Sequence, residues 1–198
     1  MAIAKKITFE GNVYHAGNKD RVAAALVTQN DNTYDGANTF SGANTFSGAN
    51  KFTGATNIVS DYESITAATK SVTAADSGTV YGFNRAAGIV VTLPTPAAGL
   101  NYKFLVETTF TGAGRIRTAT TDGTDGFLGS ISILDTGEIG ETDNFQPAAS
   151  NDFIDLGQIE QGWLTGGYIN FTGLNATTWF VEGVLMGDGT LETVFEDA

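Results

Sequence analysis

The chain has 198 residues, of which 25 are glycine and none is cysteine, and its formal net charge is −12. Without cysteine there is no disulfide framework and no thiolate chemistry, and the excess of carboxylates disfavours binding to nucleic acids or anionic membranes. Abundant glycine together with many β-branched and aromatic residues predicts an all-β protein with tight turns.

The negative charge is unevenly placed along the chain. Residues 1–61 carry five basic and five acidic side chains, whereas residues 118–198 carry fourteen carboxylates and no lysine or arginine. This pattern predicts a solubilising acidic surface on the second half, with a specific cation-binding face as the alternative. No apolar run reaches the roughly 18 residues of a membrane span, and the start, MAIAKKITFEG, lacks the apolar core of a secretory signal. We therefore expect synthesis in the cytoplasm and no membrane partner.

Residues 1–31 are predicted to form an extended N-terminal arm. Lys6 to Tyr14 alternates apolar and polar residues, as a short strand does, and Arg21 to Gln29 is compatible with a strand or a short helix. The only histidine, His15, lies in a loop-like segment and is interpreted as a solvated residue. Because the arm holds four of the ten cations, we expect it to bind an acidic partner.

Residues 32–61 are predicted to form a stem. Four consecutive hexapeptides, NTYDGA, NTFSGA, NTFSGA and NKFTGA, run from Asn32 to Ala55. Six is a multiple of two, so in an extended chain one residue of each repeat projects to the same face. The residues on that face, including one apolar residue that continues the register, are Tyr34, Phe40, Phe46, Phe52 and Ile58.

The number of repeats decides how these rings can be buried. Hexapeptide coils need about three repeats each, and coils need stacked neighbours to share a core. Four repeats make little more than one coil, so one chain alone cannot bury the rings. We therefore predict a homotrimeric β stem with the rings along its axis. A flexible linker is the alternative.

Residues 62–198 are predicted to form an antiparallel β-sandwich or jelly-roll-like domain. Turn signals recur every eight to twelve residues, which is typical of sandwiches and barrels, here with about eight strands. The first stretch, 61–76, is compatible with a strand or with one helical turn capped by Ser64. Trp163 and Trp179 are expected in the core or on a sheet face. The predicted strand segments are TVYGFN, AGIVVTLP, LNYKFLVET, GRIRTAT, GFLGSISIL, DFIDLGQI, GYINFTGL and TTWFVEGVLMG.

Two stretches resemble known virion proteins. Residues 73–107, with their ADSG and VTLPTPAAGL motifs followed by an aromatic-rich strand, resemble a module of small structural proteins of tailed, marine-type phages. The NTFSGANTFSGA run is similar to the repeats of trimeric phage fibre stems. The resemblance implies a role on the virion, and the short chain with an acidic domain and no long shaft favours a capsid decoration or cement protein over a long tail fibre.

Catalytic motifs are weak throughout the chain. With one histidine and no cysteine, a His-based triad or an HExxH metal site has no support. Gly112 to Thr118 lacks the third glycine of a dinucleotide loop, and the TDGTDG segment, 121–126, is interpreted as an acidic turn rather than a calcium loop. A pair of carboxylates for glycoside hydrolysis stays open as a minor alternative. We predict no enzyme activity, no cofactor, no metal and no catalytic residue.

The function expected from these features is a virion-surface protein, made in the host cytoplasm, that binds the major capsid protein as a homotrimer. The alternative is a tail or adsorption fibre that recognises a host glycan through Trp163, Tyr168 or Trp179. The residues expected to attach the arm to the capsid are Lys5, Lys6, Ile7, Phe9, Lys19 and Arg21.

The stem hypothesis predicts the oligomeric mass of the chain. Light scattering of the full protein is expected to give three times the chain mass of 20.7 kDa. Removal of residues 32–55 is expected to give monomers, because the trimer contacts are assigned to the repeats. A full-length chain that is monomeric at micromolar concentration contradicts the stem.

Overall fold

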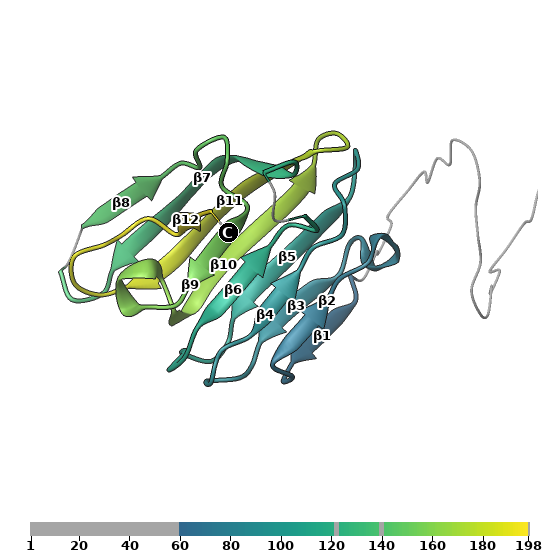
Figure 1. Ribbon diagram of the computed structural model, residues 1–198. Coiled ribbons are helices and arrows are strands. Elements are labelled where there is room, and N and C mark those ends of the chain that lie inside the picture. Colours follow the sequence, from purple (N-terminus) through teal and green to yellow (C-terminus); the bar gives the residue numbers. More distant parts are fainter. Residues whose placement is uncertain (1–59, 121–122, 139–140, 198) are drawn as a thin grey trace, which may run out of the picture. The chain divides into compact units, whose positions relative to one another are not determined.

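The computed structural model describes residues 60–120, 123–138 and 141–197 (Figure 1). The predicted arm, 1–31, lies outside these described residues, as does the predicted stem up to residue 59. The predicted trimer and capsid contacts also lie outside them, namely Tyr34, Phe40, Phe46, Phe52, Ile58, Lys5, Lys6, Ile7, Phe9, Lys19 and Arg21. The compact unit that contains the described residues spans Asn57–Ala198.

Two β-sheets build this unit and enclose one core between them (Figure 1). The seven-stranded sheet has, in spatial order, β1 (Tyr62–Ile65), β3 (Val80–Phe83), β5 (Asn101–Val106), β10 (Leu164–Gly173), β11 (Thr178–Gly187), β7 (Gly126–Asp135) and β8 (Thr142–Phe145). The five-stranded sheet has β12 (Phe195–Glu196), β9 (Phe153–Leu156), β6 (Gly114–Arg117), β4 (Val90–Thr92) and β2 (Thr69–Ser71). The all-β prediction is confirmed.

The first six strands alternate between the two sheets. As a result β1, β3 and β5 are parallel neighbours in one sheet, and β2, β4 and β6 are parallel neighbours in the other. Tyr62 pairs with Val80, and Val80 pairs in turn with Lys103, so successive coils advance by 18 and 23 residues. This half of the unit is therefore a short parallel coil, in which every strand pairs with the strand one coil later.

The second half adds antiparallel pairs. The hairpin of β10 and β11 is antiparallel, β10 closes onto β5, and β8 folds back on β7, whereas β11 and β7 run parallel over ten residue pairs. Both sheets are thus mixed, and the predicted purely antiparallel sandwich is wrong. The physical reason is that turn spacing sets strand length, whereas parallel pairing arises when the chain crosses to the other sheet between two neighbours.

All eight predicted strand segments contain a strand. The stretch 61–76, for which strand was one of two alternatives, contains β1 and β2, whereas β8 and β12 were missed. Ser64 lies within β1 and caps no helix. The helical turn lies later, at Ala74–Asp76, where the Asp76 carboxylate accepts hydrogen bonds from the backbone N–H and the hydroxyl of Thr73. These bonds to the ionised form hold the pKa of Asp76 below its usual value.

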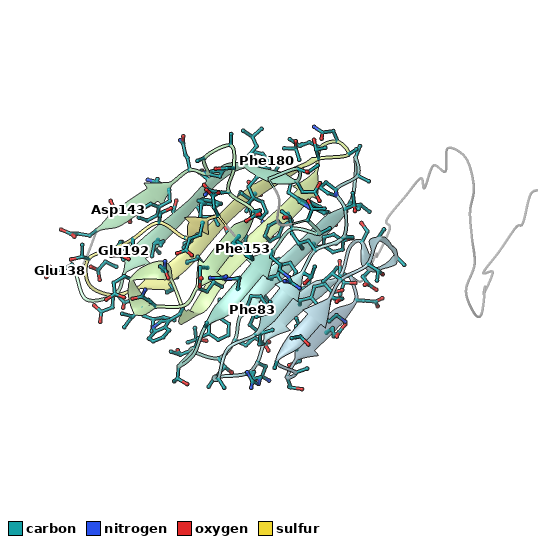
Figure 2. The ribbon with its side chains drawn as sticks, in the orientation of Figure 1. Phe83, Glu138, Asp143, Phe153, Phe180 and Glu192 are labelled. Atoms are coloured by element: carbon teal, nitrogen blue, oxygen red, sulfur yellow. The ribbon has the colours of Figure 1, made fainter. Side chains whose placement is uncertain are left out.

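Aromatic rings on the inner face of the seven-stranded sheet form the centre of the core. The predicted alternation along β5 is confirmed, because Tyr102, Phe104 and Val106 are all buried. The Tyr81 and Phe104 rings stack with centroids 5.2 Å apart, and Phe171 meets Phe104 edge-on at 5.6 Å. Figure 2 shows the side chains around this core, with Phe83 labelled. Each such pair adds about 1 kcal/mol beyond the burial of its area.

Burial of Tyr81 also shifts its titration. The side chain has no exposed surface, and burial raises the pKa of its hydroxyl to about 12, because the charged phenolate is poorly solvated there. The unfolded chain ionises near the usual value of about 10. This contribution to stability is therefore complete below pH ~10 and is lost as the pH rises towards 12.

The β7–β11 pairing makes a steric prediction. Gly129 has φ 129°, and a Cβ there would lie 2.0 Å from the carbonyl oxygen of Val181 on β11. Gly129→Ala is expected to lower the free energy of unfolding by about 3 kcal/mol, since two backbones would have to separate. Urea unfolding followed by tryptophan fluorescence measures the change.

The matched control is Gly78→Ala. Gly78 has φ 96° but open space around its added Cβ, so only backbone strain of about 1 kcal/mol applies. Equal losses in the two variants would contradict a close approach of β7 and β11.

Candidate functional site

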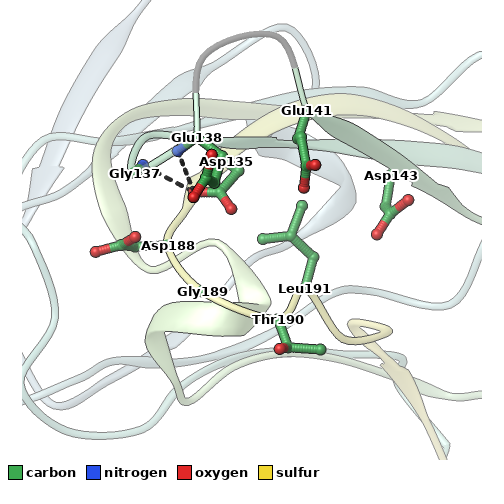
Figure 3. Close-up of a pocket in the computed structure, with 9 residues that line it drawn as sticks. All are labelled: Asp135, Gly137, Glu138, Glu141, Asp143, Asp188, Gly189, Thr190 and Leu191. Atoms are coloured by element: carbon green, nitrogen blue, oxygen red, sulfur yellow. Dashed lines mark hydrogen bonds between the residues drawn. The ribbon is translucent and has the colours of Figure 1, made fainter.

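An acidic hollow lies at one end of the domain, where the turn between β7 and β8 faces the segment that follows β11 (Figure 3). Figure 2 shows Glu138, Asp143 and Glu192 at this same end. The hollow has a volume of about 630 Å³. Its lining residues come from two chain segments and are Asp135, Gly137, Glu138, Glu141, Asp143, Asp188, Gly189, Thr190 and Leu191.

The parallel pairing of β7 with β11 creates the hollow. Asp135 pairs with Gly187 at the end of both strands, so the loops that follow diverge from the same point. Thr136 closes the junction, because its backbone N–H and its hydroxyl both donate to the Gly187 carbonyl oxygen at 2.9 Å. A Cβ on Gly137 would lie 2.3 Å from Asp188 Oδ1. A larger residue at position 137 would therefore displace the Asp188 carboxylate.

The five carboxylates of the hollow have different environments. Asp135 is buried, and its Oδ1 accepts hydrogen bonds from the N–H groups of Gly137 at 2.8 Å and Glu138 at 3.3 Å. Glu138, Glu141 and Asp143 are exposed. Throughout the described residues no group of three or more His, Cys, Asp or Glu side chains is arranged to hold a metal ion. The hollow is thus a spread of negative charge that attracts cationic groups at long range.

A second cluster of charged side chains surrounds Arg115 on β6 of the five-stranded sheet. Arg115 donates to the Asp155 carboxylate on β9 and lies 3.6 Å from the Glu196 carboxylate on β12. Its guanidinium also lies over the Phe153 ring, 4.6 Å from the centroid. The contacts stabilise the short edge strand β12, which Gln161 also holds through a hydrogen bond from Nε2 to Glu196 Oε1 at 3.2 Å. This cluster serves the fold by joining β6, β9 and β12.

An exposed tyrosine pairs with a carboxylate at the edge strand β1. Tyr62 donates its hydroxyl hydrogen bond to Glu107 Oε1, and this bond raises the pKa of Tyr62 above its usual value. Tyr62 is 53% exposed. The pair links β1 to the residue after β5 across β3, and a raised pKa on a hydroxyl disfavours a role for Tyr62 as a base.

The three aromatic residues that were expected to bind a glycan differ in how far they are exposed. Trp179 has no exposed surface, so its predicted contact with a glycan is wrong and its predicted core position is confirmed. Trp163 is partly buried against the core. Tyr168 lies half-buried on the outer face of β10, with Lys103 Nζ 4.9 Å from its ring centroid. Because Trp179 is buried, it cannot form a shared ligand-binding surface with Tyr168 and Trp163.

Sequence reasoning missed the acidic hollow. The carboxylates of residues 135–143 and of Asp188 were visible, and so were the glycines beside them. These two segments lie close together because β7 pairs with β11 as well as with β8, its neighbour in sequence. A pattern of polar turns does not encode that choice of partner.

Comparison of the chain with protein-family models, with curated proteins and with solved structures finds no match. Among the described residues, none of the helices has the length and apolar character needed to cross a membrane.

The Arg115 cluster makes a prediction about stability. Arg115→Met is expected to cost about 2 kcal/mol in urea unfolding, because the Asp155 side chain, 9% exposed, would lose its partner. The full 3 to 5 kcal/mol of a buried pair is not expected, since the Arg115 side chain is 35% exposed and screened by solvent.

Arg117→Met is the control on the same strand. Arg117 is exposed and donates to the Thr92 hydroxyl at 2.8 Å, so its loss is expected to cost about 0.5 kcal/mol or less. If the two substitutions cost the same, the Arg115 cluster does not hold β12.

Proposed function

We propose that this protein is a virion structural protein, a capsid decoration or cement protein that binds the capsid surface as a trimer and stabilises the particle. The observation that carries the proposal is the parallel coil of β1 to β6, which begins a few residues after the hexapeptide repeats. Repeats followed by coiled β-structure are an arrangement suited to a mechanical role, in which strands stack along one direction.

The position of the first coil supports a stem of β-structure that leads into the domain. β1 and β2 are edge strands of the two sheets, and β1 begins a few residues after the last hexapeptide. Successive coils advance by 18 and then 23 residues, so the coil itself keeps no hexapeptide period.

Charge supports attachment through the arm. The described part of the chain from residue 118 onward carries carboxylates and no lysine or arginine, so the domain is repelled by nucleic acid and directed to solvent. The cations Lys5, Lys6, Lys19 and Arg21, with Ile7 and Phe9, are the residues that we assign to contact with the major capsid protein.

The mechanism is mechanical. A decoration protein that bridges neighbouring capsid subunits adds interface that exists only in the intact shell, which shifts the equilibrium away from rupture. Three linked arms on one trimer raise the effective concentration of each weak contact, so that affinity increases without any new contact. No chemical step is required of the acidic domain.

The second candidate is an adsorption fibre that recognises a host glycan. The observation that favours it is Tyr168, which presents part of its ring on the outer face of β10 beside Lys103. An aromatic face beside a polar group is a common element of sugar-binding surfaces. In this case the arm would bind tail proteins instead of the capsid.

The proposal predicts that arm charges govern capsid binding. In cosedimentation with purified expanded capsids, the full chain carrying Lys5→Gln, Lys6→Gln, Lys19→Gln and Arg21→Gln is expected to bind at least about tenfold more weakly. Four exposed ion pairs at a few tenths of a kcal/mol each give this loss. Capsids carrying the wild-type protein are expected to release DNA at a higher temperature than capsids without it.

Lys51→Gln is the control, because Lys51 lies in the repeats rather than in the arm. Binding to purified tails and not to capsids would support the fibre candidate. Equal thermal stability of capsids with and without the protein would contradict cementing.

A further inference from the structure

Two exposed leucines lie at one end of the seven-stranded sheet. Among the described residues, three large apolar side chains are exposed, namely Tyr62, Leu128 and Leu174, at 53%, 55% and 44%. Tyr62 has a polar partner, because its hydroxyl donates to the Glu107 carboxylate. Leu128 on β7 and Leu174 just after β10 carry no polar group. A single exposed leucine is ordinary, whereas apolar side chains that gather on a surface mark a place of contact.

Strand register brings the two leucines together around Phe180 on β11. Leu128 pairs directly with Phe180 across β7 and β11. The Leu174 N–H donates to the Thr178 carbonyl oxygen at 3.0 Å, and Thr178 lies two residues before Phe180 on the same face of β11. Trp179, between them, points into the core, so Phe180 points outwards, and it is partly exposed (Figure 2). We call Leu128, Leu174 and Phe180 the hairpin-end patch.

The hairpin-end patch is uncharged, although it belongs to a strongly acidic domain. The two segments that form it, 126–132 and 173–181, contain no Asp, Glu, Lys or Arg, and the next carboxylate on this face of β11 is Glu182. From residue 118 onward the chain carries fourteen carboxylates and no lysine or arginine. Two copies of the chain therefore repel each other over most of this half, and the hairpin-end patch lets them approach without bringing carboxylates together.

The size of the patch limits the kind of partner. Stable protein interfaces bury roughly 1,200–2,000 Å², and three side chains, one of them already partly buried, supply only a small part of this area. A partner free in solution at micromolar concentration would therefore bind too weakly. A partner held nearby by another contact differs, because a tether raises its effective concentration to about the millimolar range. The sister chains of the proposed trimer are such partners.

The chain enters the domain at the same end of the sheet as the patch. β1, β5, β11 and β7 run in one direction, so Tyr62 lies at the end where β11 and β7 also begin. Four strand spacings separate β1 from β11, which at about 4.8 Å each is about 19 Å. The chain from Phe52 to Tyr62 can reach about 33 Å when extended. The repeats of three chains can therefore associate while their patches are in contact.

We propose that the hairpin-end patch packs against the same patch of the sister chains, so that the three domains are joined at the end nearest the stem. This inference rests on the proposed trimer and adds to it the surface through which the domains meet. Contact between the patches removes their apolar side chains from water, which favours association. The trimer is then closed at its domains as well as along its repeats.

The test uses single cysteines in the full chain, which has none of its own. Leu128→Cys and Leu174→Cys are each treated with a short bis-maleimide at micromolar protein concentration and separated on a denaturing gel. Each is expected to give at least about tenfold more covalent dimer than Thr142→Cys, because a short linker joins only thiols that it can span. Thr142 is the matched control, since it is exposed on β8 of the same sheet but lies at the opposite end of the strands.

A second variant tests the patch itself. Leu174→Asp in the Leu128→Cys chain places a carboxylate in every patch and is expected to reduce the dimer to the level of Thr142→Cys. Because Leu174 is exposed, tryptophan fluorescence is expected to stay unchanged and so to show an intact fold.

Light scattering of the same samples separates this inference from the proposed function. A trimeric mass without excess dimer at positions 128 and 174 overturns the contact between patches and leaves the trimer in place. A monomeric mass without excess dimer overturns both. Undiminished cross-linking in the Leu174→Asp variant also contradicts contact through the patch.

Discussion

The continuous layer of aromatic rings between the two sheets is the interaction on which the rest of the domain depends. Tyr81, Phe104, Phe171 and Trp179 come from β3, β5, β10 and β11, and each ring lies within 6.3 Å of the next, centroid to centroid. The layer therefore crosses the boundary between the parallel coil of the first six strands and the antiparallel strands of the second half. A chain without disulfides gains its stability from such burial.

That layer also fixes where polar chemistry is placed. Because inner positions are filled mainly with rings and aliphatic side chains, most carboxylates lie at strand ends, in connecting loops or on outer faces, and the buried Asp155 on β9 is paired with Arg115. Two such ends differ in a way that matters for function. At the acidic hollow the charges are spread and mostly exposed, whereas Asp125, just before β7, is buried and its Oδ2 has no hydrogen bond. The acidic hollow therefore suits long-range attraction of cations.

The sequence by itself determined the all-β class, eight of the strands and the buried alternation of Tyr102, Phe104 and Val106, because period-two patterning is a local property of the backbone. It also determined the charge asymmetry. The strand partners were decided only by the tertiary structure, since parallel pairing of β1 with β3 or of β7 with β11 joins segments that local patterning does not connect. The short edge strand β12 was missed for the same reason: two residues carry no period, and a neighbour across the sheet defines the strand. The burial of Asp125 likewise followed from packing, because a carboxylate in a glycine-rich turn has the same sequence whether water or protein surrounds it.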